Sequence, residues 1–283
     1  MSDQPITPEV RQWIIEQTVA GQPPDAVLAA MLESGWREDV ALGAVENVLQ
    51  EHLAEQTRRV ALTPALAVPE PLPGDTRASI WAGDREVQVL ASLRSPRVVV
   101  FGGLLSPDEC DELVVLARSR LSRSETVQTA TGASEVNDAR TSEGMFFERG
   151  EYPLCARIEA RIAALLAWPV ENGEGLQILR YGMGAEYKPH YDYFDPAQPG
   201  TPVILRRGGQ RVASLVCYLS TPVRGGVTVF PDVQLEVAPV QGNAVFFSYD
   251  RPHPMTRTLH GGAPVLEGEK WVATKWLREG RFE

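Results

Sequence analysis

The chain has 283 residues, a length that suits one domain of about 200 residues plus an appendage. Hydrophobic residues make up 43% of the chain and charged residues 23%, so a sizeable core can be buried and most of the chain is not disordered. The formal net charge of −10 argues against a protein that coats nucleic acid or an anionic membrane, and we expect neither as a partner.

Residues 1–57 carry a helical pattern. Apolar residues at helical spacing predict a first helix over about residues 7–21, a second over 23–35 and a third over 37–53. Prolines near the starts and glycines near the ends support these boundaries. Three short helices with a Gly35-Trp36 turn resemble a ubiquitin-associated (UBA) domain. The segment is then either a small packing module or an adaptor for a peptide or protein partner.

Most of the negative charge lies in this first segment. Residues 1–57 hold ten acidic residues and two arginines, a net charge of −8, whereas the other 226 residues hold 27 acidic and 25 basic residues, a net charge of −2. Any partner of the segment is therefore expected to be basic. Residues 58–75 follow with four prolines and no helical stripe, which predicts an extended, semi-rigid linker and a domain boundary.

Residues 76–283 have the pattern of a mixed α+β domain. Amphipathic helices are predicted at 106–121 and 153–167, with a polar loop region at 122–150 between them. Several short β segments, broken by glycine and proline, predict a sandwich or jelly roll. These segments are residues 97–106, 176–182, 211–220, 227–231, 235–239, 243–249 and 270–277.

The cysteines and the N-terminal stretch indicate the cellular compartment in which the protein resides. Three widely spaced cysteines, an odd number, exclude a disulfide framework and a cysteine-based zinc site, and they are typical of a reducing compartment. The stretch MSDQPITPEV is acidic and polar, unlike a secretory signal. No run approaches the roughly 20 apolar residues that a membrane helix needs. We therefore expect a cytoplasmic protein.

A possible metal-binding pair lies in the string YKPHYDYF. If this string is extended, the side chains of His190 and Asp192 project to the same side. A second histidine from a distant strand would complete a two-histidine, one-carboxylate set, the arrangement expected of non-haem Fe(II) oxygenases. Structural zinc would instead want four ligands, usually with sulfur. A histidine and an aspartate in a polar loop are commonly no ligands at all, so the third ligand is the test.

The string TLHGGAPVLEGEKWVATKWL supplies candidates for that test. His260 lies in it, and Lys270 follows ten residues later at the start of a predicted strand. A lone cation buried in a β-barrel needs an anionic partner, which a carboxylate-bearing cosubstrate would supply. The alternative for Lys270 is an exposed residue at a strand start.

At these residues the chain resembles a known family. From about residue 95 to 281 it is similar to the prolyl 4-hydroxylases of the Fe(II)/2-oxoglutarate dioxygenase superfamily. The matching strings include ILRYGMGAEYKPHYDYF, GGVTVFP and LHGGAPVLEGEKWVATKWL, and their order and spacing agree. The resemblance implies a double-stranded β-helix (jelly roll) flanked by helices, with its core at about residues 176–278 of a catalytic domain that spans 76–283.

The resemblance also implies roles for individual residues. The implied iron ligands are His190, Asp192 and His260. The implied 2-oxoglutarate site consists of Lys270, which pairs with the C5 carboxylate, together with Tyr181 and Thr228. The implied groove for a peptide substrate is lined by Tyr187, Arg211 and Trp276. A structural role remains the alternative for each groove residue, and His253 matches no ligand position and is expected to be a loop residue.

The implied activity is Fe(II)- and 2-oxoglutarate-dependent hydroxylation of peptidyl proline to 4-hydroxyproline. O₂ is the oxidant, succinate and CO₂ are coproducts, and ascorbate is the expected reductant. Two alternatives stay open: a 2-oxoglutarate hydroxylase that acts on a non-proline side chain or a small molecule, and a non-catalytic interaction protein on a degenerate oxygenase barrel. The intact triad and Lys270 argue against degeneracy.

Overall fold

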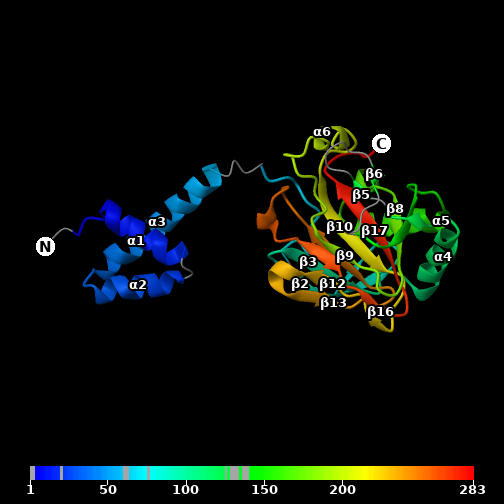
Figure 1. Cartoon of the computed structure of the whole chain (residues 1–283), viewed down its shortest axis with the longest axis horizontal. Coiled ribbons are helices and arrows are strands. Elements are labelled where there is room, and N and C mark those ends of the chain that lie inside the picture. The colour runs from blue at the N-terminus through cyan, green and yellow to red at the C-terminus, as the bar shows by residue number, and fades with distance from the viewer. Residues whose placement is uncertain are drawn as a thin grey trace. The chain divides into compact units, whose positions relative to one another are not determined.

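The computed structural model describes residues 4–19, 22–59, 64–74, 77–124, 126–127, 134–135 and 140–283. The chain divides into two compact units, Met1–Thr63 and Pro64–Glu283 (Figure 1). Among the residues described, no helix combines the length and the apolar character that crossing a membrane requires.

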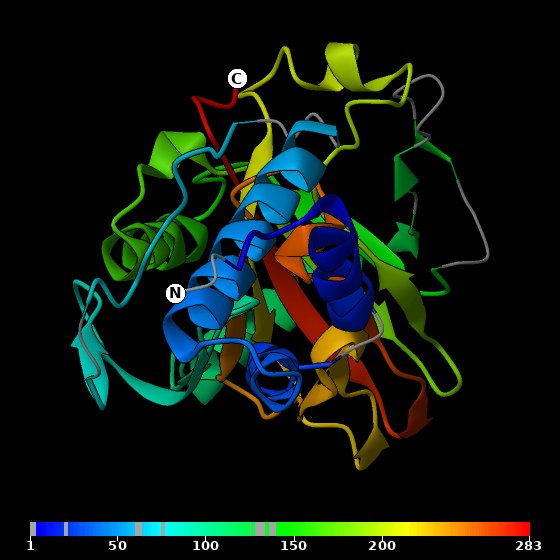
Figure 2. The same ribbon diagram turned by 90° about the vertical axis from the view of Figure 1, so that its left-hand side faces the viewer.

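The first unit contains three helices, drawn in blue in Figure 2: α1 (Pro8–Val19), α2 (Pro24–Glu33) and α3 (Glu38–Arg59). Gly35 has a φ of 86°, a left-handed conformation that favours glycine and lets the chain turn from α2 into α3. The buried side chains form one small core, made of Ile14, Val27, Met31, Ala41, Ala44, Val45 and Val48. The unit therefore has a hydrophobic core of its own.

The second unit contains two main antiparallel sheets. The larger has nine strands in the order β1-β2-β3-β14-β10-β17-β8-β7-β4. Its strands are β1 (Ser79–Trp81), β2 (Glu86–Leu93), β3 (Arg97–Gly102), β4 (Ser122–Arg123), β7 (Glu143–Phe147), β8 (Leu176–Tyr181), β10 (Arg211–Tyr218), β14 (Ala244–Ser248) and β17 (Lys270–Arg278). The smaller has the order β13-β12-β15-β9, with β9 (Tyr187–His190), β12 (Thr228–Phe230), β13 (Leu235–Val237) and β15 (His260–Gly262). Two antiparallel sheets of this kind fit the expected jelly roll.

The second unit also contains shorter elements. There are two two-stranded sheets among the described residues. One pairs β5 (Thr126–Val127) with β6 (Ser134–Glu135), and the other pairs β11 (Arg224–Gly225) with β16 (Val265–Glu267). The remaining short helices are α6 (Thr201–Ile204) and the 3₁₀ turns η1 (Val170–Asn172), η2 (Pro231–Val233) and η3 (Pro254–Thr256).

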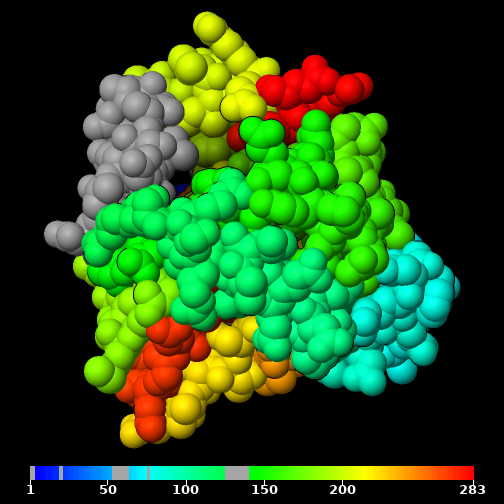
Figure 3. All heavy atoms as spheres, turned by 90° about the vertical axis from the view of Figure 1, so that its right-hand side faces the viewer, coloured from blue at the N-terminus to red at the C-terminus, as the bar shows by residue number. Residues whose placement is uncertain are grey.

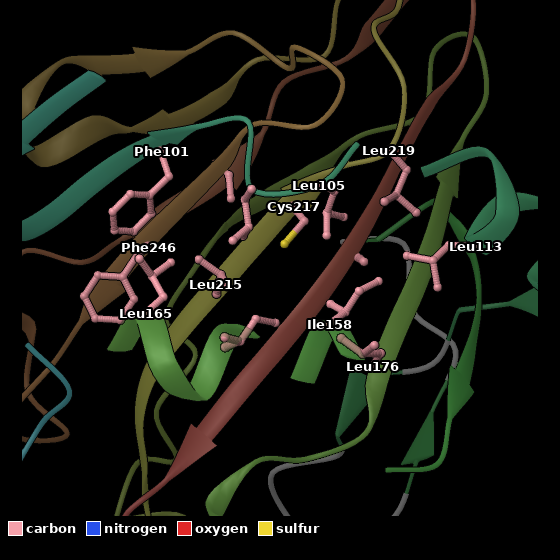
Figure 4. Close-up of a cluster of buried hydrophobic side chains, with 14 of the residues drawn as sticks. Phe101, Leu105, Leu113, Ile158, Leu165, Leu176, Leu215, Cys217, Leu219 and Phe246 are labelled. Carbon is pink, nitrogen blue, oxygen red and sulfur yellow. The ribbon is translucent and has the colours of Figure 1, made fainter. Parts of the chain in front are cut away.

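Two longer helices, α4 (Pro107–Arg118) and α5 (Pro153–Leu166), lie on the face of the second unit shown in green shades in Figure 3. Ser106 and Glu109 form a capping box that fixes the start of α4. Apolar side chains of both helices pack against the large sheet, among them Leu113, Ile158 and Leu165 (Figure 4). This core supports the sheet from one side and leaves its other side to the functional residues.

One expectation from the sequence is wrong. Part of the loop region predicted at 122–150 is strand β7, which pairs with β8 inside the large sheet. Met145 and Phe147 are buried, and a Cβ on Gly144 would lie 2.7 Å from the side chain of Leu179. The polar residues around this short strand obscured its alternating apolar pattern.

Residues 64–74, within the predicted linker, belong to the second unit and pack against the rest of it. The Leu66 amide donates a hydrogen bond to the Asp250 carbonyl oxygen, and Pro69 and Leu72 are buried. Glu70 also forms an ion pair with Arg97. The break between the units therefore falls near residue 63.

Candidate metal centre and adjoining cavities

The pairing of β9 with β15 places two histidines opposite each other. His190 and His260 are partners in the register of these strands, and Asp192 lies two residues beyond the end of β9. His190 Nε2 lies 3.5 Å from Asp192 Oδ1, and His260 Nε2 lies 3.6 Å from Asp192 Oδ2. All three ligand atoms lie within 4.8 Å of one another. The strand ends before Asp192, so the turn after it, rather than extended geometry, brings the carboxylate to the histidines.

The imidazole rings are held so that both Nε2 atoms face the carboxylate. His190 Nδ1 lies 2.9 Å from the Lys188 carbonyl oxygen, and His260 Nδ1 lies 3.0 Å from the Thr258 carbonyl oxygen. In the neutral ring each Nδ1–H then donates to a carbonyl, and Nε2 keeps the lone pair that binds a metal. The Tyr187 ring stacks on His190 with a centroid distance of 3.7 Å.

The ionisation states of Asp192 and His260 also suit a metal. Burial alone would raise the pKa of Asp192, but His260 and His190 hold it below its ordinary value. Burial lowers the pKa of His260 to about 4, so this imidazole is neutral at pH 7. An ionised carboxylate and a neutral imidazole are the forms that bind metal ions. Two imidazoles and one carboxylate fit a non-haem Fe(II) site with open coordination positions.

A small recess of about 50 Å³ adjoins the triad, and Lys270 lines it together with Tyr181 and Thr228. Lys270 is 4% exposed, and its Nζ lies 5.5 Å from the ring centroid of Tyr181. Within the described part of the chain no carboxylate pairs with it. Burial lowers the pKa of Lys270 to about 8. A buried ammonium group without a counter-charge is unfavourable, so an anionic ligand in the recess would stabilise it.

A larger cleft of about 890 Å³ lies on the other side of the triad. Tyr187, Arg211 and Trp276 all line it, as expected for the groove residues. Five of the described residues border both cavities: Arg140, Tyr187, His190, Asp192 and Trp276. The cleft and the recess therefore meet at two of the candidate metal ligands, His190 and Asp192.

Arg211 does not offer its guanidinium group freely to the cleft. Its Nε and Nη2 atoms donate to the two carboxylate oxygens of Glu174, at 2.7 and 2.9 Å. Its Cζ lies 3.8 Å from the ring centroid of Trp276. Its Nη1 atom donates to the Asp192 carbonyl oxygen at 3.5 Å, so Arg211 lines the cleft, as expected, with its donors directed to protein acceptors. Glu174 gave no signal of its own in the sequence, because its partners Arg211 and Arg278 are far away along the chain.

Trp276 carries an unpaired hydrogen-bond donor at the wall of the cleft. Its indole Nε1 is buried, and among the described residues it has no hydrogen-bond partner. A buried donor of this kind is unfavourable unless a ligand satisfies it. The ring also lies on the border of both cavities. This unpaired N–H is a candidate contact for a substrate carbonyl oxygen.

His253, which matches no ligand position in the sequence, lines the larger cleft. It lies in a loop, as expected, but the loop forms part of the cleft wall, with Pro252 and Pro254 on either side of it. His253 Nδ1 accepts a hydrogen bond from the Met255 amide at 3.1 Å. The string RPHPM has no periodicity, so only the folded structure reveals that it faces the cleft.

The second unit is similar to known proteins. Residues 176–278 match the model of the 2OG-Fe(II) oxygenase superfamily. Prolyl 4-hydroxylase 2 of Arabidopsis thaliana is 40% identical over 213 residues, which cover 66% of this chain and 69% of that protein. Prolyl 4-hydroxylase 1 of the same plant is 40% identical over 227 residues, covering 71% and 78%. The 2OG complex of the viral collagen prolyl hydroxylase vCPH from Paramecium Bursaria Chlorella virus-1 aligns with a TM-score of 0.49 and 30% identity, over 64% of this chain and 95% of that one.

The geometry of the triad predicts stabilisation by a divalent metal. Mn²⁺ at about 100 times its Kd should stabilise the folded protein by about 2.7 kcal/mol, which corresponds to a rise in Tm of roughly 5–10 °C for a unit of this size. His260→Ala should abolish the shift, because it removes one of three ligands. His253→Ala is the matched control and should keep it. Differential scanning fluorimetry measures the shift, and an equal shift in His260→Ala would contradict the assignment.

Proposed function

The chain belongs to the prolyl 4-hydroxylases of the 2OG-Fe(II) oxygenase superfamily, and on that premise we propose that it hydroxylates proline in a peptide or protein substrate to 4-hydroxyproline. Fe(II) is the metal, 2-oxoglutarate the cosubstrate and O₂ the oxidant, with succinate and CO₂ as coproducts and ascorbate as reductant. The observation that carries the proposal is the convergence of His190, Asp192 and His260 beside the recess that contains Lys270.

Each side chain of the triad and the recess has a part in this reaction. His190, Asp192 and His260 would hold the iron, which when bound would supply the oxidation of an unactivated C–H bond, coupled to decarboxylation of 2-oxoglutarate. Lys270 binds the C5 carboxylate of the cosubstrate and so fixes its orientation, a positioning role. Tyr181 and Thr228 line the same recess. The Thr228 hydroxyl oxygen accepts a hydrogen bond from Tyr218, which leaves its own proton for the cosubstrate.

The larger cleft suits a proline-containing chain. Tyr187 and Trp276 present aromatic rings next to the triad, and aromatic grooves bind extended proline-rich segments. The unpaired Trp276 N–H is available to a backbone carbonyl oxygen. The ion pair with Glu174 holds Arg211 over the Trp276 ring, so Arg211 supports this wall of the cleft. The names of the Arabidopsis relatives support proline as the target.

The first prediction from this proposal concerns the product. The full chain with Fe(II), 2-oxoglutarate and ascorbate should release succinate in the presence of a proline-containing peptide and add 16 mass units to it, as measured by mass spectrometry. Asp192→Ala should reduce both products to background, because it removes a ligand of the metal. The same peptide with alanine in place of proline is the control. A product on the alanine peptide would instead favour a hydroxylase of another side chain.

The second prediction concerns Lys270. Lys270→Ala should raise the KM for 2-oxoglutarate by about 30-fold or more, since truncating a buried charged partner costs about 2 kcal/mol or more. In the wild type this KM should rise as the pH increases above about 8, because Lys270 loses its charge as the pH passes its pKa. Lys188→Ala removes an exposed lysine and should leave the KM unchanged. Steady-state succinate assays from pH 6.5 to 9.5 measure these values, and a pH-independent KM would refute the role.

We further propose that residues 1–57 are a UBA-like adaptor that binds a basic partner. Acidic residues outnumber arginines ten to two in this segment. The two arginines pair with Glu51 and Asp39. Exposed acids without an ion pair among the described residues include Glu33, Glu38 and Glu46. Uncompensated negative charge of this kind attracts a positively charged surface.

The third prediction tests this charge. The full chain should bind a fluorescent lysine- and arginine-rich peptide in anisotropy titrations, more weakly at higher salt because exposed charges are screened. The triple variant Glu33→Gln, Glu38→Gln, Glu46→Gln should bind it more weakly. A matched triple variant of exposed acids in the second unit, Glu112→Gln, Glu236→Gln and Glu267→Gln, should bind as the wild type does. If both triple variants lose peptide affinity equally, the acidic residues of 1–57 are not the specific binding site.

A further inference from the structure

We propose that Ser214 and Tyr249 are positioning residues that fix the carboxylate of Asp192 for metal binding. The inference rests on the proposed function, since it takes Asp192 to be a metal ligand. Ser214 Oγ donates a hydrogen bond to Asp192 Oδ2 at 2.5 Å. The same hydroxyl lies 3.0 Å from the Tyr249 hydroxyl. Two hydroxyl groups thus extend from the carboxylate into the protein interior.

The large sheet places both hydroxyls. Ser214 lies in β10, which pairs with β14, and Tyr249 directly follows β14. The Tyr249 amide donates to the Val212 carbonyl oxygen at 2.9 Å, so pairing continues past the end of β14. Ser214 is 0% exposed and Tyr249 is 1% exposed. Neighbouring strands of a rigid sheet therefore hold the two groups, and Asp192 meets them from the turn after β9.

The hydrogen bonds have a defined direction. An ionised carboxylate only accepts hydrogen bonds, so the single proton of the Ser214 hydroxyl goes to Asp192. The Ser214 oxygen is then free to accept the proton of the Tyr249 hydroxyl. Tyr249 thereby strengthens the donor that contacts Asp192, because successive hydrogen bonds polarise one another. Tyr249 acts on the carboxylate through Ser214.

This chain restricts the rotation of the carboxylate. Asp192 Oδ1 lies 3.5 Å from His190 Nε2 and Oδ2 lies 3.6 Å from His260 Nε2, so each carboxylate oxygen has its own imidazole neighbour. The bond from Ser214 to Oδ2 holds that orientation. A ligand held in place before the metal arrives binds it more tightly, and partners of this kind typically contribute 10- to 100-fold in metal affinity. Buried hydroxyls in an apolar strand are unfavourable unless they are satisfied, and this arrangement satisfies them.

The test measures Mn²⁺ affinity of the full chain by isothermal titration calorimetry. Ser214→Ala should weaken binding by about 10-fold or more. Tyr249→Phe keeps the ring, removes only the hydroxyl and should weaken binding by a smaller factor. In the double variant the loss should equal that of Ser214→Ala alone, because Tyr249 acts through Ser214. The visible spectrum of the Co²⁺-loaded protein should also change in Ser214→Ala.

Tyr152→Phe is the matched control and should bind Mn²⁺ as the wild type does. The Tyr152 ring packs edge-on against Phe147, and its hydroxyl makes no hydrogen bond with the described residues. Circular dichroism establishes that each variant is folded. Should Ser214→Ala fail to fold, Tyr249→Phe decides alone, and wild-type affinity in that variant would overturn the inference.

The remaining outcomes separate the two proposals. If the wild type does not bind Mn²⁺, the metal site and with it the proposed function fail. If the wild type binds and Ser214→Ala binds equally well, the metal site stands and the positioning role fails. If the losses of Mn²⁺ affinity in the two single variants add up in the double variant, Tyr249 does not act through Ser214, and that part of the inference fails.

Discussion

The register between β9 and β15 is the constraint on which the site depends. It places His190 opposite His260, although 70 positions separate them in the chain. A slip by one residue would turn one of these side chains to the opposite face of the sheet. Gly261 permits the pairing, because a Cβ there would lie 2.8 Å from the Tyr187 carbonyl oxygen. The glycine next to His260 therefore allows the close backbone approach that brings the histidines together.

Two buried charges of opposite sign line the small recess. Asp192 is ionised and buried beside neutral His260, and Lys270 is buried without a carboxylate partner in the described structure. Each charge is unfavourable in isolation, and each is stabilised by a ligand of opposite sign. A divalent cation and a dicarboxylate bound side by side would satisfy both. The ligands would therefore stabilise the fold, because they bind the native state and not the unfolded chain.

The sequence predicted those parts of the fold and site that have local patterns. The HxD spacing and the ten-residue step from His260 to Lys270 are visible in short strings, and the structure brings all four side chains together. Strand β7 escaped prediction because five residues amid polar sequence carry little periodicity. The contact of Glu174 with Arg211 joins residues 37 positions apart, and nothing local in the sequence reveals it. Contacts that only tertiary packing creates have no local sequence pattern from which they can be predicted.

That contact limits which groups in the cleft Arg211 can bind. Glu174 accepts hydrogen bonds from both Arg211 and Arg278, so an acidic substrate group would have to compete with it for Arg211. Breaking a buried ion pair is strongly unfavourable, so Glu174 retains Arg211 in this competition. If the cleft binds the substrate as proposed, recognition at this wall depends on the Trp276 ring and its unpaired N–H. An aromatic face with a neutral donor suits the apolar ring and backbone carbonyl of a proline residue better than it suits a charged side chain.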